Sequence, residues 1–402
     1  MMIITEVTTV SIRPIVFSLL PMIFTVASVL GPVVGGLLAT YVSWRWCFYI
    51  NLCFGGVAVP IFILSFSPKT PKGSFLEKLQ KLDLVGSFLM IAAIVLLLLA
   101  TSFGVNEFPW RSGAVISCFV LSGLLMIAFI IWNFKYSKAP LVSAGIGKHV
   151  RMQMAILSMS FGFGAYMIGV QFVSIYFQIV RDNDAVHTGL SLLPLIIVCA
   201  IFSTIGGLSV KLSGCTRPIS MTAGLFLCVG SGILALLQVQ ETFSKRVGLL
   251  IVLGVGTGLV IQPAFVCVQV LAPKENHGII MATAFANFAR NIICAVVSQI
   301  GQVVYTETLK SNLAHVGKIN DVSTGFDLVE LADNSGLLKT FSKADQLIIK
   351  GAFIMSIHNT FYFGLACAAV SLLCACFMPN AKLPSTKKAK KISDDTSEMD
   401  KK

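Results

Sequence analysis

The sequence is poor in charge and lacks the residue groupings that mark most enzyme sites. Only 12% of its 402 residues are Asp, Glu, Lys or Arg, roughly half the share of an ordinary soluble domain. The five histidines are scattered, the 11 cysteines follow no disulfide or metal spacing, and no glycine-rich phosphate loop is present. We therefore expect no enzyme, no catalytic residue, no metal site and no cofactor.

Long apolar runs make up what remains. Hydrophobic residues account for 56% of the chain, and a run of about 18 or more mostly apolar residues is long enough to cross a bilayer. The chain is thus predicted to be an all-α polytopic membrane protein with ten transmembrane helices. The predicted spans are 14–40, 46–66, 84–101, 114–134, 152–178, 186–210, 218–238, 247–271, 278–305 and 352–377.

The positive charge of the chain follows this topology. Lys and Arg concentrate in the loops around Lys78 and Lys148 and in the tail after Lys382, and short basic loops stay in the cytosol. Both termini are therefore predicted to be cytosolic, and the long loop 306–350 to lie on the other side. The net charge of +12 is explained by this asymmetry and does not call for a nucleic-acid partner.

A stripe of small residues stands out in the first span. Ala27, Gly31 and Gly35 recur every four residues around Pro32, and Gly36 follows them. Small side chains on one helix face let another helix approach closely. Shortly afterwards comes a junction with a Trp-Arg-Trp sequence, of which we single out Trp44, Arg45, Trp46 and Asn51.

Stripe and junction together resemble the antiporter signature on the fifth helix of fungal 14-span drug:proton antiporters of the major facilitator superfamily. Further similar segments follow in the family's order, namely 101–104 with 108–110, 188–194, 254–269 and 287–290. The first of these patterns, 101–104 with 108–110, is similar to that of the branch with vacuolar basic-amino-acid transporters and dye- or azole-resistance pumps.

The resemblance implies the major-facilitator fold, with the ten spans matching helices five to fourteen and the first four lacking. Residues 1–66 would be the remnant of the N-terminal six-helix half, and 67–140 a basic linker with two extra helices. Residues 141–380 would form the C-terminal half, and 381–402 a disordered cytosolic tail.

A few polar side chains remain inside the spans and are candidates for a translocation path. They are Gln171, Gln178, Gln262, Gln269, Asn287 and Arg290. Amides spaced seven apart share a helix face, where they either join helices or line a hydrated path. Arg290 lies deep in its span and is expected to face the bundle interior, supported by Asn287, either in a cavity or as a clamp on backbone carbonyls.

Two functional hypotheses follow. In the first, the chain is part of a secondary transporter that exports drugs, amphiphilic cations or basic amino acids in exchange for protons, in the plasma or vacuolar membrane. In the second, it is a truncated, transport-incompetent relative or gene fragment of one. All acidic residues are expected at loops, span edges or termini, whereas proton coupling needs a carboxylate in the path.

Overall fold

The computed structural model describes residues 27, 30–65, 83–137, 140–141, 144–147, 149–239, 242–273, 278–319 and 342–380. Within these ranges the chain is helical, with no strand. The elements are η1 (Leu38–Val42), α3 (Trp46–Ser65), α5 (Leu84–Asn106), α6 (Gly113–Ile131), η2 (Trp132–Tyr136), α7 (Ala144–Gly147), α8 (Val150–Ile175), η3 (Tyr176–Val180), α9 (Ala185–Ser213), α10 (Arg217–Ile233), η4 (Leu234–Leu236), α11 (Phe243–Leu271), α12 (Gly278–Ile319) and α14 (Lys343–Phe377).

Nine helices of the described residues are long and apolar enough to cross a membrane, and they coincide with nine of the ten predicted spans. The all-α, multi-pass membrane architecture is thereby confirmed. The first predicted span, 14–40, is covered only by Ala27 and by the shorter apolar helix Leu30–Val42. The predicted tail 381–402 and the basic loop around Lys78 lie outside the described residues.

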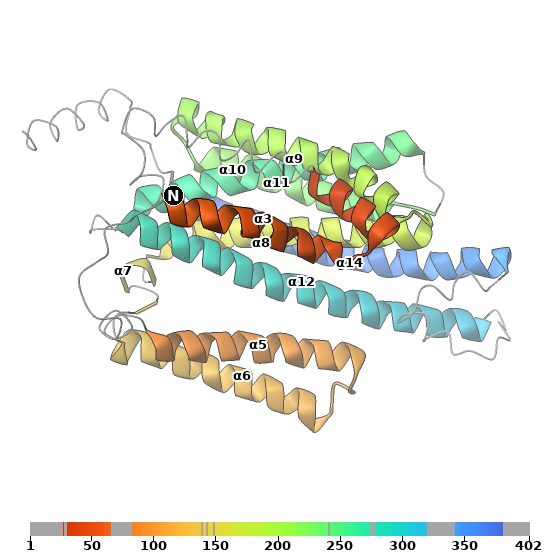
Figure 1. The fold of residues 1–402 in the computed structure, drawn as a ribbon, viewed down its shortest axis with the longest axis horizontal. Helices are drawn as coiled ribbons and strands as arrows, with labels where there is room; N and C mark the ends of the chain where they lie inside the picture. The colour runs from red at the N-terminus through yellow and green to blue at the C-terminus, as the bar shows by residue number, and fades with distance from the viewer. Residues whose placement is uncertain are drawn as a thin grey trace, which may run out of the picture.

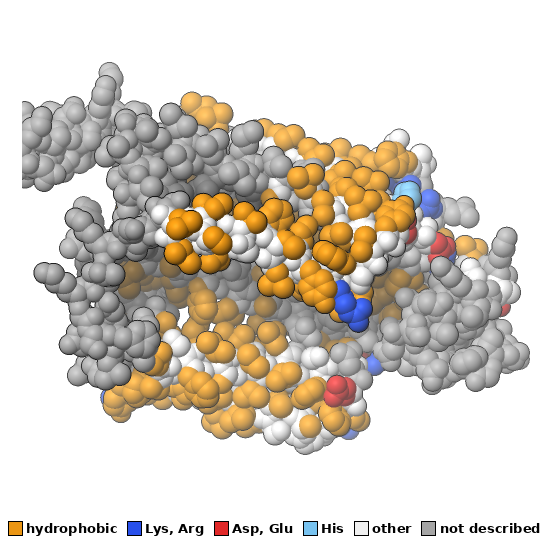
Figure 2. Space-filling view, in the orientation of Figure 1, with side chains coloured by type: hydrophobic (Ala, Val, Ile, Leu, Met, Phe, Trp, Pro, Cys, Tyr) orange, Lys and Arg blue, Asp and Glu red, His pale blue; other side chains and the backbone are white. Residues whose placement is uncertain are grey.

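Six helices form the main bundle. Helix α8 packs against α11, α12 and α14, and α11 packs between α9 and α10 (Figure 1). The core is filled by fully buried large side chains, among them Phe172, Tyr176, Leu253 and Phe361. The outer faces carry apolar side chains, seen as orange surface in Figure 2, as expected where hydrocarbon replaces water around a protein.

Helices α5 and α6 form an antiparallel hairpin beside this bundle (Figure 1). The hydroxyl of Ser122 donates to the carbonyl of Ala93 at 2.7 Å and joins the two helices at mid-length. At the base, the carboxylate of Asp83 caps α5 by accepting from the backbone N–H of Gly86 at 2.8 Å. The same carboxylate accepts from the Trp132 indole at 2.9 Å and the Ser137 hydroxyl at 2.7 Å. One side chain thus ties the start of α5 to the end of α6.

This arrangement makes the stability of the hairpin depend on pH. Partial burial by itself raises the pKa of Asp83, but the hydrogen bonds from Ser137, Gly86 and Trp132 outweigh it and hold the pKa below its ordinary value of 3.8. Since the folded pKa is the lower one, the stabilisation is present above about pH 4 and is lost as the pH falls through the folded pKa. Asp83→Ala is expected to lower the free energy of unfolding by about 1–2 kcal/mol, measured by thermal unfolding.

The matched control is Asp184→Ala. Asp184 also caps a helix, accepting from the backbone N–H of His187 at 2.7 Å. Its carboxylate also contacts the His187 ring, so both interactions lie within its own turn. Its loss should therefore cost less than that of Asp83. An equal effect of the two substitutions at neutral pH would contradict the role of Asp83 as the tie between α5 and α6.

The described N-terminal helices have their main contact with the bundle at α9. The exposed helix α3 has no buried side chain in its apolar window, whereas η1 contacts α9. A Cβ at Gly36 would lie 2.7 Å from the carbonyl oxygen of Ala185, and one at Gly189 2.5 Å from that of Pro32. The two backbones can meet only because both positions are glycine.

Two helices extend beyond their predicted ends. Helix α12 continues to Ile319 and α14 begins at Lys343, so both reach into the range 306–350 that was expected to be a loop. The extension is held by buried apolar residues, since Leu309 and Leu313 of α12 share a core with Ile349 of α14. Expecting a loop over these parts was wrong, because polar residues lower the hydropathy there although the two helices continue to pack through their apolar residues.

Candidate functional site

Arg290 is a charged residue in the middle of a membrane-spanning helix. It follows the first residue of α12, Gly278, by twelve positions, which corresponds to about 18 Å along the helix axis. At such depth an arginine costs about 2.5–3.5 kcal/mol on insertion scales unless it is paired or hydrated. The contacts of this guanidinium therefore decide what it does.

Two phenyl rings from neighbouring helices enclose the guanidinium. Its central carbon lies 4.8 Å from the ring centroid of Phe163 on α8 and 5.8 Å from that of Phe265 on α11. One terminal nitrogen is 3.5 Å from the side-chain oxygen of Asn291, at the limit of hydrogen bonding. The buried Nε has no hydrogen-bond partner, and no described carboxylate lies within ion-pair distance of Arg290.

The Arg290 guanidinium is thus a cation held between two aromatic rings, and its Nε–H remains available as a hydrogen-bond donor. Cation–π contacts contribute about 0.5–2 kcal/mol each, more when desolvated, and so offset part of the cost of burial. They leave the Nε–H without an acceptor. A guanidinium in this state can donate to an oxygen of a bound molecule.

The predicted support from Asn287 is absent. Its amide donates to the backbone oxygen of Thr283 on its own helix at 3.1 Å, and Asn291 takes the place near the guanidinium. Helix geometry had put Asn287 on the same face, but the side chain bonds to its own backbone instead.

The four glutamines lie on two helices and do not form one group. Gln171 of α8 is exposed and donates to the side chain of Gln302 on α12 at 3.2 Å, so it joins two helices. Gln178 is exposed within η3. On α11, Gln262 faces α9, where it is the neighbour of Gly207, and Gln269 is half-buried near the end of the helix.

The small-residue stripe and the junction have mainly local contacts. A Cβ at Gly31 or Gly35 would meet nothing within 4 Å, and Ala27 is exposed, so the close approach to α9 occurs one position further, at Gly36. In the junction, Arg45 stacks over Trp44 at 4.9 Å.

The remaining junction residues, Trp46 and Asn51, also contact residues of their own segment. Trp46 packs edge-on against Tyr49. Asn51 bonds back to the carbonyl of Cys47 at 3.5 Å.

The sequence analysis missed a charged pair. Lys350 of α14 donates to the carboxylate of Asp182 in the corner between α8 and α9. The side chain of Lys350 is only 11% exposed, and that of Asp182 is 52% exposed. The pair joins residues 168 positions apart, so sequence spacing gave no signal for it. Lys350 had been assigned to a loop.

Glu307 is also part of a helix rather than a loop. It lies on α12 and its carboxylate accepts from the indole N–H of Trp110 at 3.0 Å. It follows the start of its span, Met281, by a length of about 39 Å. That length exceeds the hydrocarbon core of about 30 Å, which places Glu307 at the membrane edge as a contact of the hairpin.

Comparisons with known proteins agree with this architecture. Residues 1–298 match the family described as "Major Facilitator Superfamily". A solved structure with a similar fold is that of a bacterial homologue of the human lysosomal transporter Spinster, in an inward-facing and unoccupied conformation. It has a TM-score of 0.50 and 14% identity, and the match covers 95% of this chain and 75% of that one.

Several fungal relatives are similar in sequence. The efflux pump roqT of Penicillium rubens is 31% identical over 366 residues, which are 90% of this chain and 66% of the relative. The MFS-type transporter ungB of Aspergillus violaceofuscus is 31% identical over 381 residues, with 94% and 68% covered. The efflux pump aunC of Aspergillus niger is 29% identical over 384 residues, with 93% and 70% covered. The chain spans about two thirds of the length of these curated relatives.

Proposed function

Because this chain belongs to the Major Facilitator Superfamily, we propose that it takes part in the export of small organic molecules across a membrane. Two of the fungal relatives described above are named efflux pumps, which supports the direction of transport. The chain itself is a multi-pass membrane protein. The 14-span branch, the plasma or vacuolar membrane and the cytosolic termini stay proposals derived from the sequence.

The observation that carries the proposal is the state of Arg290. A mid-span guanidinium held by two rings, with an unpartnered Nε, is expensive for a purely structural residue. It becomes favourable when a passing molecule or water accepts from it. In secondary transporters, sites of this kind near the bilayer midplane bind the substrate.

The charge of Arg290 also bears on the substrate. An organic cation or a basic amino acid, as predicted from the resemblance, is repelled by a guanidinium without a counter-ion. Such a substrate requires a carboxylate facing the path from residues outside the described ranges, and so does proton coupling. A neutral or anionic aromatic molecule requires neither, and it matches the rings and donors that the described residues present.

The alternative is that the chain does not transport. The apolar window of α3 has no buried residue, and a helix this exposed adds little to a transport pathway. We keep this alternative because the main contact of α3 and η1 with the bundle is that of η1 with α9. Uptake of an organic dye by vesicles containing the purified protein, driven by a pH gradient, would exclude it.

Replacing Arg290 tests the proposed site. We express the protein as its gene encodes it in cells without competing pumps, and we measure the efflux of a cationic and of an anionic fluorescent dye. Arg290→Ala is expected to reduce efflux about tenfold or more, as the loss of a charge-assisted hydrogen bond of about 1.5–3 kcal/mol implies. Arg290→Lys should keep more activity because it retains the charge.

The matched control is Arg246→Ala. Arg246 also stacks on two phenyl rings, those of Phe177 and Phe243, and its Nε is likewise buried without a hydrogen-bond partner, but it lies near the start of α11. Its loss removes similar packing and leaves the mid-span charge in place. Equal efflux by Arg290→Ala and the unmodified protein would refute the proposed role of Arg290.

A further inference from the structure

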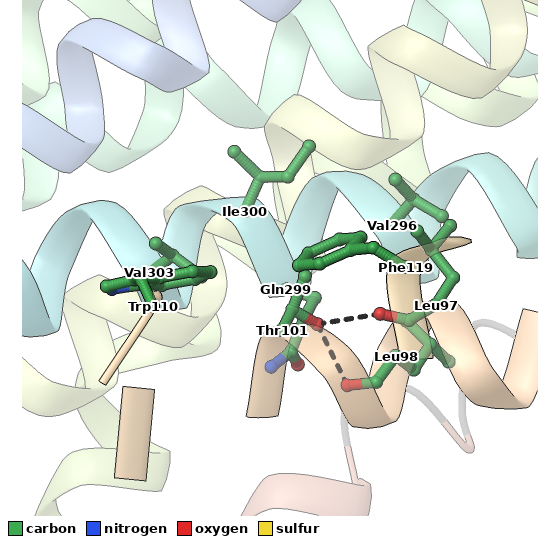
Figure 3. Close-up of a pocket in the computed structure, with 9 residues that line it drawn as sticks. All are labelled: Leu97, Leu98, Thr101, Trp110, Phe119, Val296, Gln299, Ile300 and Val303. Carbon is green, nitrogen blue, oxygen red and sulfur yellow. Dashed lines mark hydrogen bonds between the residues drawn. The ribbon is translucent and has the colours of Figure 1, made fainter. Parts of the chain in front are cut away.

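A cavity lies between the α5–α6 hairpin and α12, away from Arg290. Its volume is about 270 Å³, larger than the engineered apolar cavities of about 150 Å³ that bind benzene. Figure 3 shows side chains from all three helices around it. The lining residues are Leu97, Leu98, Thr101, Trp110, Phe119, Val296, Gln299, Ile300 and Val303.

The surface turned toward this cavity is apolar. The hydroxyl of Thr101 already donates hydrogen bonds to the backbone oxygens of Leu97 at 3.2 Å and Leu98 at 2.8 Å, as the dashed lines of Figure 3 show. The indole N–H of Trp110 is engaged with Glu307, and Gln299 turns no polar atom toward the cavity. An occupant is therefore recognised by the shape of its hydrocarbon and not by hydrogen bonds.

The cavity lies on a different face of α12 from Arg290. Val297, two turns after Arg290, faces α8, where a Cβ at Gly164 would lie 2.9 Å from it. At 100° per residue, Val296, Ile300 and Val303 point roughly 120°, 80° and 140° away from the direction of Arg290. A molecule in the cavity would thus lie against another face of the helix than the Arg290 site, which argues against a transported substrate.

The environment of the cavity indicates which kind of molecule occupies it. Both walls are membrane-spanning helices, Leu84–Val105 and Gly113–Tyr136 on one side and Met281–His315 on the other, so the medium at this depth is lipid hydrocarbon. The hairpin is fastened to α12 at one end, by the Trp110–Glu307 hydrogen bond and by Lys310, whose ammonium donates to the carbonyl of Val105 at 2.8 Å. Along the rest of the hairpin, Figure 2 shows open space between the hairpin and the bundle.

The charges at the fastened end balance. Glu107 and Arg111 lie close to Trp110 in the sequence, and from α12 Glu307 contacts Trp110 and Lys310 contacts Val105. Two acids and two bases give no preference for a charged headgroup, which favours a zwitterionic lipid.

We propose that this cavity is a lipid site that holds an acyl chain of a zwitterionic phospholipid, and that the chain fills the seam between the hairpin and the six-helix bundle. The apolar lining, the engaged polar atoms, the position between spanning helices and the balanced charges together define the occupant. The proposal does not depend on what the protein transports.

The test is the retention of phosphatidylcholine by the purified protein. The protein is reconstituted with this lipid, washed in detergent, and examined by native mass spectrometry. Leu98→Phe fills the cavity from α5. The matched control, Leu124→Phe, places the same ring on the exposed face of α6. We expect one retained lipid per chain for the unmodified protein and the control, and at least about fivefold less for Leu98→Phe.

Three results would overturn the proposal: no retained lipid on the unmodified protein, equal retention by all variants, or a retained apolar compound that is not a phospholipid. Should Leu98→Phe fail to accumulate, Val303→Phe fills the same cavity from α12. Exchange of phosphatidylcholine for phosphatidylglycerol should not raise the retained fraction, because the charges at the fastened end balance; stronger retention of the anionic lipid would contradict the headgroup assignment.

Discussion

Gly256→Val is expected to remove most of the folded protein from the membrane. Gly256 of α11 faces α10, where an added Cβ would lie 2.6 Å from the Cα of Leu227. On the other side of α11, a Cβ at Gly258 would lie 2.5 Å from the carbonyl oxygen of Cys199 on α9. Overpacking in a core costs about 1–3 kcal/mol when side chains can adjust. Here the obstacle is the backbone of a neighbouring helix, so the penalty exceeds that range.

The same helix supplies the control. Gly248 lies near the start of α11, and a Cβ there would meet nothing within 4 Å, so Gly248→Val changes the same residue type without a clash. The measurements are the amount of monodisperse protein extracted from membranes and its thermal unfolding midpoint. Accumulation of Gly256→Val at the level of Gly248→Val would show that α10 and α11 do not pack as closely as described.

Asp182→Asn is expected to destabilise the protein by about 2–3 kcal/mol, since it leaves the ammonium of Lys350 buried without a counter-ion. Removing one partner of a fully buried pair costs about 3–5 kcal/mol, and the value is smaller here because half of the Asp182 side chain is exposed. Asn is the matched replacement, because Asp182 has a φ of 53° and Asn also tolerates this left-handed conformation.

A double-mutant cycle separates the charge effect from the packing effect. Lys350→Met keeps the length of the side chain and removes the charge, so in this background Asp182→Asn should cost less than about 0.5 kcal/mol. Unfolding is followed thermally in detergent at neutral pH. The same loss of stability from Asp182→Asn in both backgrounds would mean that the carboxylate stabilises something other than Lys350.

Span positions were predictable from the sequence because they depend on the length of apolar runs, and nine of them coincide with observed helices. The C-terminal end of α12 and the N-terminal end of α14 were not predictable in this way, because hydropathy falls where a helix leaves the hydrocarbon. A signal did exist in the periodicity. Tyr305, Leu309 and Leu313 recur every four residues and are all buried, which is the pattern of one helix face.

The candidate site was predictable in part. The depth of Arg290 follows from counting along one span, and this was sufficient to single it out. Its partners Phe163 and Phe265 lie on other helices, as Asp182 does for Lys350, and a single sequence does not encode which helices are neighbours. For the same reason the cavity between the hairpin and α12 could not be predicted from the sequence.

The length of α12 has a practical consequence for imaging. Its 42 residues span about 63 Å, roughly twice the hydrocarbon thickness, and α14 accompanies it, with Asn312 donating to Ser356 at 2.9 Å. Figure 1 shows both helices extending past the rest of the bundle. In electron micrographs this two-helix projection would be visible on one side of the detergent micelle. Its position would allow individual particles of this small membrane protein to be aligned without a bound antibody fragment.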